Sequence, residues 1–328
     1  MLFTAKRKSS IIFKDHVIRL IDSNKPDLDS IRAFHQRFLP EDIIREGKIR
    51  DLETLKMILE DCVGEWKLKG QEVAFLVPDS QVVVRKVQVP SDIQDNELKG
   101  YIFLDIGTSI HLPFENPVFD IHTIEVTDEG RIVLLYAAPE EIVTGYAELL
   151  EKVKVKPVAA DLSPFAIFRL YQECGQGGLE DNTLCIELNV QTANLSIFDG
   201  GNLVFSRHLR MNVDIGGWKK EKGEDDLEYL VWAGSEEHLW GELRDIISEI
   251  ERVMSFYRFS LNQGKKQITH ILLTGEHPWI LKFHERLKEM TELAIYTFPE
   301  KMFFTAKGQS IPSSFYTCLG LSLKEVKK

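Results

Sequence analysis

Polar residues that could contact a phosphate lie in the turn of a predicted hairpin, at residues 189–192. The run LCIEL at 184–188 is apolar, and NLSIFD at 194–199 alternates apolar and polar residues, so both segments are expected to be strands. A turn that holds a diphosphate needs glycine, because without a Cβ the backbone N–H groups can converge on the anion. Here Asn189-Val190-Gln191-Thr192 stands in that place. The sequence therefore predicts a phosphate-type hairpin that has lost its glycines.

A second hairpin of the same kind is predicted near the start of the chain. Residues 10–13 and 17–21 are apolar and rich in isoleucine, and Lys14-Asp15-His16 separates them as a turn. After each hairpin, predicted helices alternate with short apolar strands, which is typical of α/β proteins. The sequence therefore predicts a duplicated α/β fold with two lobes and a cleft between them.

The composition favours a globular protein that does not bind nucleic acid. The chain has 328 residues, of which 44% are hydrophobic and 28% charged, and its net charge is −11. Nucleic-acid binding needs a basic face. The four cysteines show neither a C-x-x-C spacing nor a disulfide framework, which suits a reducing compartment. No apolar run reaches the roughly 18 residues of a membrane span, so we expect a cytoplasmic protein without direct membrane insertion.

A change in composition at residues 91–156 predicts a small subdomain inserted into the first lobe. The segment begins with an acid-rich helix, continues with a strand-turn-strand unit and ends in a helix that starts at Pro139. The run Gly-Gln-Gly-Gly at 175–178 follows a helix and is expected to be a linker. We expect a first lobe at 1–178, including the insertion at about 91–156. The second lobe is expected at 179–328, with a helical subdomain at about 213–262.

Two further sets of residues are not expected to form a phosphate turn or a metal site. Asp105-Ile106-Gly107-Thr108-Ser109 has the letters of a phosphate turn, but a helix precedes it and Leu-Pro-Phe follows it, where a phosphate hairpin needs two strands. His111, His122 and His208 have no metal-ligand spacing to one another or to a cysteine. The sequence therefore predicts no metal site at these histidines.

Several long segments resemble the type IV pilus assembly protein PilM family, a relative of the cell-division protein FtsA in the actin-like ATPase superfamily. The most specific is LLYAAPEEIVTGYAELLEKVKVKPVAADLSPFAIFRL at 134–170, and others are LPEDIIREGKIRDLETLKMILEDC at 39–62 and SEIERVMSFYRFSLNQGKKQITHILLTG at 248–275. The resemblance covers nearly the whole chain. It implies a bilobed actin-like (ribonuclease H-like) α/β fold around a cleft.

The three nucleotide motifs of that family are altered in this sequence. In the first turn, aligned on 12–19, Ile12 replaces the acid and Lys14 the glycine, and Asp15 and His16 replace serines. In the second, aligned on 187–194, Asn189 and Gln191 replace the glycines. The third, at 273–276, has Glu276 in place of its second glycine. The residues that the resemblance assigns to this degenerate site are Lys14, Asp15, His16, Glu187, Asn189, Gln191, Thr192, Asn194, Thr274, Gly275 and Glu276.

These changes predict weak or absent nucleotide binding. Ile12 has no oxygen for Mg²⁺, which prefers oxygen ligands. Asp15 and Glu276 would bring negative charge near a phosphate, at a cost of about 1–4 kcal/mol each at about 4 Å. Lys14 could still bind a phosphate as a point charge. We therefore expect a pseudo-ATPase with no cofactor, and ATP with Mg²⁺ remains the alternative.

The resemblance implies that this chain binds the N-terminal cytoplasmic tail of a PilN-like inner-membrane protein. Other pilus assembly proteins are further expected partners. These partners would hold the chain next to the membrane. The groove is expected between the first lobe and the insertion, at Arg85, Lys86, Leu112, Pro113 and Phe114. Equally, Arg85 and Lys86 could be ordinary charges of an edge strand. Two alternatives stay open: an ATP-dependent switch of the same machinery, and a sugar-kinase-like enzyme of the same superfold.

Overall fold

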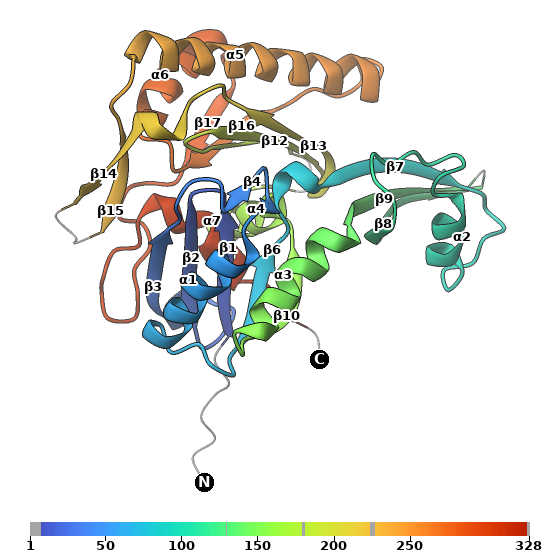
Figure 1. Ribbon diagram of the computed structural model, residues 1–328. Coiled ribbons are helices and arrows are strands. Elements are labelled where there is room, and N and C mark those ends of the chain that lie inside the picture. The colour runs from blue at the N-terminus through green and yellow to red at the C-terminus, as the bar shows by residue number, and fades with distance from the viewer. Residues whose placement is uncertain (1–7, 129, 179–180, 224–226, 327–328) are drawn as a thin grey trace.

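Two five-stranded sheets form the body of the protein in the computed structural model (Figure 1). The structure describes residues 8–128, 130–178, 181–223 and 227–326. The first sheet has the order β10-β6-β1-β2-β3. Its strands are β1 (Lys8–Lys14), β2 (Val17–Ser23), β3 (Ile31–Phe38), β6 (Glu72–Leu76) and β10 (Lys156–Asp161). The short strands β4 (Ile44–Arg45) and β5 (Lys48–Ile49) pair with each other beside it.

The second sheet repeats the first. Its order is β13-β12-β11-β16-β17. In each sheet, the three strands that come first in the chain (β1–β3 and β11–β13) pair antiparallel. The two later strands (β6 and β10, β16 and β17) run parallel to the first of them. Its strands are β11 (Asn182–Leu188), β12 (Thr192–Asp199), β13 (Asn202–Arg210), β16 (His270–Gly275) and β17 (Ala294–Thr297). This equivalence confirms the duplication predicted from the two hairpins.

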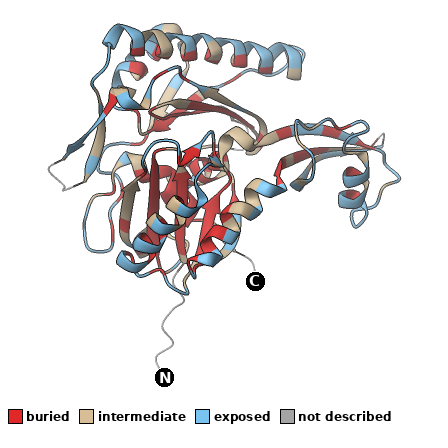
Figure 2. Ribbon diagram, in the orientation of Figure 1, coloured by how far each residue is buried: buried red, intermediate tan, exposed pale blue. Residues whose placement is uncertain are grey.

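Helices cover both sheets and fill the space between them. Apolar clusters place α1 (Leu52–Glu65) and α3 (Glu140–Lys152) on the outer face of the first sheet, and α5 (Glu236–Ser255) and α6 (Ile280–Met290) on that of the second. A third cluster surrounds α4 (Ser163–Glu173) and α7 (Tyr316–Ser322), which lie between the sheets. Figure 2 shows buried residues on the strands of both sheets. The result is a bilobed, layered α/β fold.

Helix α7 crosses α4 at a very short distance. A Cβ on Gly320 would lie 2.0 Å from the carbonyl oxygen of Ala166, so only glycine allows this approach. From there α7 reaches the first sheet, where Cys318 Sγ donates to the carbonyl of Ser10 at 3.2 Å. The prediction that 179–328 belongs entirely to the second lobe is therefore wrong for α7, whose apolar residues complete the core against β1 and β2.

The inserted subdomain is a three-stranded sheet with one helix, and it projects from the first lobe (Figure 1). It consists of β7 (Val83–Val89), α2 (Leu98–Asp105), β8 (Pro117–Thr127) and β9 (Gly130–Pro139), in the sheet order β7-β9-β8. The predicted bounds of 91–156 are wrong at both ends. β7 belongs to the insertion because it pairs with β9, whereas α3 packs its Leu149 and Leu150 into the core of the first lobe.

The predicted helical subdomain at 213–262 is only partly helical. Its first part is a ribbon of β14 (Trp218–Lys222) and β15 (Glu228–Trp232), in which Trp218 lies opposite Trp232. Helix α5 follows and ends in a π-helical turn at Phe256–Leu261. Aromatic cross-strand pairs stabilise such ribbons. Here the Trp218–Trp232 pair outweighs the preference of the acidic sequence around it for a helix. No helix in the described part of the chain is long and apolar enough to cross a membrane.

Candidate functional site

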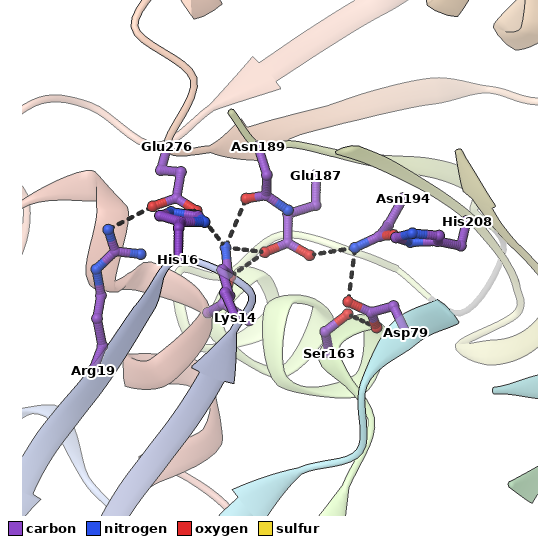
Figure 3. Close-up of polar contacts among 11 residues, drawn as sticks. Lys14, His16, Arg19, Asp79, Ser163, Glu187, Asn189, Asn194, His208 and Glu276 are labelled. Atoms are coloured by element: carbon purple, nitrogen blue, oxygen red, sulfur yellow. Dashed lines mark hydrogen bonds and ion pairs between the residues drawn. The ribbon is translucent and has the colours of Figure 1, made fainter. Parts of the chain in front are cut away.

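The two hairpin turns and the end of β16 meet in the cleft between the lobes (Figure 3). Lys14 ends β1, Glu187 lies near the end of β11, and Glu276 follows β16. Because β11 and β16 are parallel neighbours, their C-terminal ends open on the same edge of the second sheet. The fold therefore brings together side chains that are far apart in the sequence.

The Lys14 side chain bridges the lobes. Its Nζ donates to Asn189 Oδ1 at 2.7 Å and to Glu276 Oε1 at 2.9 Å, and it lies 3.4 Å from Glu187 Oε1. Burial alone would lower the pKa of Lys14, but the carboxylates of Glu276 and Glu187 outweigh it and raise the pKa above its ordinary value. The ammonium group is therefore held charged among three oxygen atoms of the second lobe.

Glu276 lies among three basic side chains of the first lobe, those of Lys14, His16 and Arg19. Arg19 Nη2 lies 2.5 Å from its Oε2, and His16 Nε2 lies 3.5 Å from its Oε1. The Glu276 side chain is only 4% exposed. Burial alone would raise its pKa, but the charges of Arg19 and Lys14 hold the pKa well below its ordinary value. Glu276 is thus a buried, ionised carboxylate that joins its loop to β1 and β2.

A second chain of hydrogen bonds continues from Glu187 to the other side of the cleft (Figure 3). Asn194 Nδ2 donates to Glu187 Oε2 at 3.0 Å and to Asp79 Oδ2 at 2.8 Å, and Asn194 Oδ1 lies 2.7 Å from His208 Nδ1. Ser163 Oγ donates to the other oxygen of Asp79. Burial and the nearby charge of Glu187 raise the pKa of Asp79 to about 7. We call these contacts, with those of Lys14 and Glu276, the interlobe network.

Members of the interlobe network line two cavities. The first has a volume of about 90 Å³ and is bordered by Lys14, Asp79 and His208. The second has a volume of about 400 Å³ and is bordered by Arg19, Glu276 and His277. Burial lowers the pKa of His277 to about 4, so this ring is neutral near pH 7.

Other predicted site residues have structural contacts. Asp15 accepts hydrogen bonds from the backbone N–H groups of Glu46 and Gly47 at 2.7 and 3.0 Å, and so fixes the β4–β5 turn. Gln191 Nε2 donates to the carbonyl of Val213 at 3.1 Å. Thr192 begins β12 beside the first cavity, and Thr274 lines the second.

Gly275 has a structural requirement of its own. Its φ is +131°, and a Cβ there would lie 2.0 Å from the carbonyl oxygen of Leu188. This glycine of the third motif is retained because β16 passes directly against the end of β11.

Sequence reasoning did not assign five residues to the interlobe network or its contacts, and it took one of them, His208, for an ordinary turn or strand residue, although His208 contacts Asn194 and lines the first cavity. Arg19 stands within the apolar strand VIRLI, and a charged residue in such a strand could have indicated a buried ion pair. The others stand in a turn, at helix starts or on a strand, where their residue types are ordinary. The five are Arg19, Asp79, Ser163, His208 and Thr317, of which Thr317 donates to Glu187 Oε1 at 2.8 Å.

The predicted groove residues lie on the insertion, but they do not form one surface. Arg85 and Lys86 are both exposed neighbours on β7, so they point to opposite faces of the sheet. Leu112 and Phe114 are half-buried and pack against the core of the insertion, whereas Pro113 is exposed. Arg85 and Lys86 therefore cannot line the same wall of a groove.

Residues 105–109 lie in the insertion, outside the cleft, as predicted. They follow α2, and the hydroxyls of Thr108 and Ser109 donate to Asp105. This arrangement fixes the end of the helix. Among the described residues, no group of three or more His, Cys, Asp or Glu is placed to hold a metal ion.

Comparisons with solved structures identify the fold. A chain of the PilM-PilN type IV pilus biogenesis complex is similar with a TM-score of 0.74 at 17% identity, over 98% of this chain and 99% of that chain. The ethanolamine utilization protein EutJ from Carboxydothermus hydrogenoformans is similar with a TM-score of 0.50 at 10% identity, over 97% of this chain and 89% of that chain. No curated protein matches the sequence. The fold is therefore the bilobed actin-like fold that the resemblance implied.

The sequence itself identifies the family. Residues 14–218 match the model of a family described as type IV pilus assembly protein PilM. The match begins at Lys14 in the first turn and extends through the insertion and the second hairpin to Trp218. It covers more than half of the chain, and this protein therefore belongs to the PilM family of type IV pilus assembly proteins.

Proposed function

We propose that this chain is a non-catalytic scaffold that binds the cytoplasmic tail of a PilN-like membrane protein, and that its cleft no longer uses ATP. The loss of ATP use is supported above all by the position of Lys14 Nζ, which lies within 3.4 Å of oxygen atoms of Asn189, Glu187 and Glu276. A cation that is part of the chain already neutralises the cleft. The lobes are therefore joined without a ligand.

The residues of the cleft do not fit Mg²⁺ with a nucleotide. Mg²⁺ requires near-octahedral oxygen ligands, and the oxygens of Glu187 and Asn189 that face the cleft already bind an ammonium group. A triphosphate would also meet the buried carboxylate of Glu276, and like charges at about 4 Å repel by about 4 kcal/mol near a protein surface.

Calorimetric titration with Mg-ATP tests the loss of nucleotide binding. We expect no binding of the wild type at micromolar concentrations. A variant with four of the family's residues restored, Ile12→Asp, Lys14→Gly, Gln191→Gly and Glu276→Gly, should bind more tightly, because the carboxylate at 12 supplies an oxygen for Mg²⁺ and the glycines let backbone N–H groups approach the phosphates. A micromolar dissociation constant for the wild type would instead favour the ATP-dependent switch.

The tail-binding part rests on the family and on the likeness to a chain of the PilM-PilN type IV pilus biogenesis complex. The insertion offers a free strand edge and apolar side chains, which are the two features that capture an extended peptide. On β7, Val87 and Val89 face α2, and Arg85 shares that face, whereas Lys86 points the other way. We place the tail on the α2 side, between the insertion and the first lobe.

Arg85 and Lys86 form a matched pair for testing this site. A fluorescently labelled PilN-like tail peptide is titrated with each protein, and binding is followed by anisotropy. Arg85→Ala should weaken binding about tenfold, because hydrogen bonds to a charged group contribute about 1.5 kcal/mol. Lys86→Ala should leave the affinity unchanged. Equal effects of the two changes would place the tail elsewhere.

Phe114→Ala tests the apolar part of the same groove. Truncation of a buried anchor at a peptide site weakens binding by roughly 2 kcal/mol, or about thirtyfold. Because Phe114 also packs in the insertion, the variant must first show a wild-type circular dichroism spectrum. A change at Trp240 on α5 of the second lobe serves as the control. If the wild type does not bind the peptide at all, the proposal that a PilN-like tail is the partner is wrong.

A further inference from the structure

Helices α1 and α3 both end on the side of the first lobe that faces away from the cleft (Figure 1). Four lysines line an open groove there. They are Lys67 and Lys69 after α1, and Lys152 and Lys154 at the end of α3. All four side chains are exposed, and we call them the lysine rim. The groove contains one carboxylate, that of Glu60.

The topology of the first sheet brings the lysine rim together. Helix α1 leads into β6 and helix α3 leads into β10, and these two strands are parallel neighbours. Both connections must therefore lie at the N-terminal edge of the sheet. They are also bonded to each other, since Gly70 N donates to Lys154 O at 2.7 Å and Lys156 N donates to Gln71 O at 2.9 Å. The lysines are thus held on a rigid edge.

Two members of the lysine rim have an unusual backbone conformation. Lys67 and Lys154 follow the two helices with φ of 58° and 65°, in the left-handed region. Helices often end in this conformation, but the residue is then usually glycine or asparagine. Lysine adopts it at an energetic cost because of its Cβ. Both helices therefore end in a residue whose side chain adds positive charge at this edge, where the backbone favours glycine.

The charge of the lysine rim is opposite to that of the whole protein. Four lysines and Glu60 give the groove a charge of +3, since 4 − 1 = 3, in a chain of net charge −11. Glu148 on α3 lies 3.8 Å from Lys152 Nζ and reduces the local charge. A polyanion that wraps around the protein would be repelled by the acidic remainder. A flat anionic surface would meet the lysine rim together with the exposed carboxylates next to it in the chain, Asp61, Glu65 and Glu151.

We propose that the lysine rim lies against the anionic headgroups of a lipid bilayer. The groove is open and lined by long flexible side chains, which suits a surface of many headgroups rather than one small anion. A lysine near such a surface strengthens binding by about fivefold. Four lysines give a weak contact, which becomes useful when a second attachment holds the protein at the membrane. The proposal does not depend on the tail-binding site, because it concerns a different edge of the lobe.

Cosedimentation of the full chain with vesicles tests the proposal. Vesicles of 30% phosphatidylglycerol and 70% phosphatidylcholine are compared with pure phosphatidylcholine, in 50 mM and 300 mM salt. We expect binding to the anionic vesicles at millimolar lipid in low salt, a strong loss in high salt, and none to the neutral vesicles. Lys69→Glu with Lys154→Glu should weaken binding at least tenfold.

The matched control is Lys219→Glu with Lys282→Glu, which makes the same change of charge on exposed residues of β14 and α6 in the second lobe. Thermal melts of both variants verify folding. Wild-type binding that survives in the control but not in the rim variant supports the proposal. Equal losses in the two variants, no loss in the rim variant, or no binding of the wild type to anionic vesicles would each overturn it.

Discussion

In the cleft, charged side chains are buried and paired between the lobes, whereas in the insertion apolar side chains remain exposed around a thin sheet. The Glu276 side chain is 4% exposed, while Phe103 and Leu104 on α2 are 59% and 77% exposed. A buried network of this kind fixes two bodies relative to each other. An exposed apolar surface on a small subdomain is typical of a surface that meets another molecule. The contrast shows that buried charge joins the lobes at the cleft, and the exposed apolar side chains of α2 agree with the partner binding that we propose for the insertion.

The largest expected effect comes from removing the cation of the cleft. Lys14→Met should lower the free energy of unfolding by about 3–5 kcal/mol, because Glu187 and Glu276 would remain buried with less compensation. Chemical denaturation measures this change. The matched variant Lys86→Met, on the exposed face of β7, should stay within about 0.5 kcal/mol of the wild type.

A double variant distinguishes charge from packing in the cleft. Lys14→Met with Glu187→Gln should recover part of the lost stability, since it removes a carboxylate together with its cation. If the double variant is less stable than Lys14→Met alone, Lys14 contributes by packing and the cleft is not joined by charge.

An intermediate effect is expected in the core of the insertion. Leu135 is fully buried on β9, and Leu135→Ala should destabilise the insertion by about 2–3 kcal/mol through the cavity that it leaves. Hydrogen exchange should rise in residues 83–139 and stay low in the two large sheets. Leu149→Ala, in the core of the first lobe, is the control and should raise exchange throughout that lobe. A uniform rise for Leu135→Ala would mean that the insertion is not a separate unit.

The smallest expected effect concerns pH. The pKa of Asp79 in the folded protein, about 7, is above its ordinary value near 3.8, so its protonated form favours folding. This contribution is complete below about pH 4 and is lost as the pH rises through 7. Since Asp79 is partly exposed to the cleft, we expect the stability of the wild type to fall by about 1 kcal/mol relative to Asp79→Asn between pH 5 and 8. Denaturation curves at both values measure the difference. Parallel profiles of the two proteins would contradict it, and Asp92→Asn on the exposed insertion controls for the lost charge.

The repeated hairpin was predictable because strand alternation and turn residues are local signals, and both sheets follow from it. The convergence of Lys14, Glu187 and Glu276 was predictable only through the family, since these residues lie in three separate turns. Arg19 and Asp79 were missed because their roles depend on partners in the other lobe. No pattern along the chain shows that β2 faces Glu276 or that residue 79 faces Asn194.

The bounds of the subdomains were predicted poorly for a similar reason. β7 has the alternating valines of any strand, and only its pairing with β9 assigns it to the insertion. Helix α3 follows β9 directly, but its leucines pack on α1 of the first lobe. Membership of a unit is decided by long-range contacts, which residue composition does not contain.

The position of α7 has a consequence for how the protein is made. Cys318 on this helix contacts Ser10 on β1, 308 residues earlier in the chain. Until the ribosome has made α7, this helix cannot cover the inner face of the first sheet, although all the strands of that sheet have been made by residue 161. Domains often fold in the order of their synthesis, but here the core of the first lobe must wait until the strands of the second lobe and then α7 have been made. A nascent chain of this protein therefore leaves an apolar face of the first sheet uncovered until α7 emerges, and the first lobe should reach its final state only after that point.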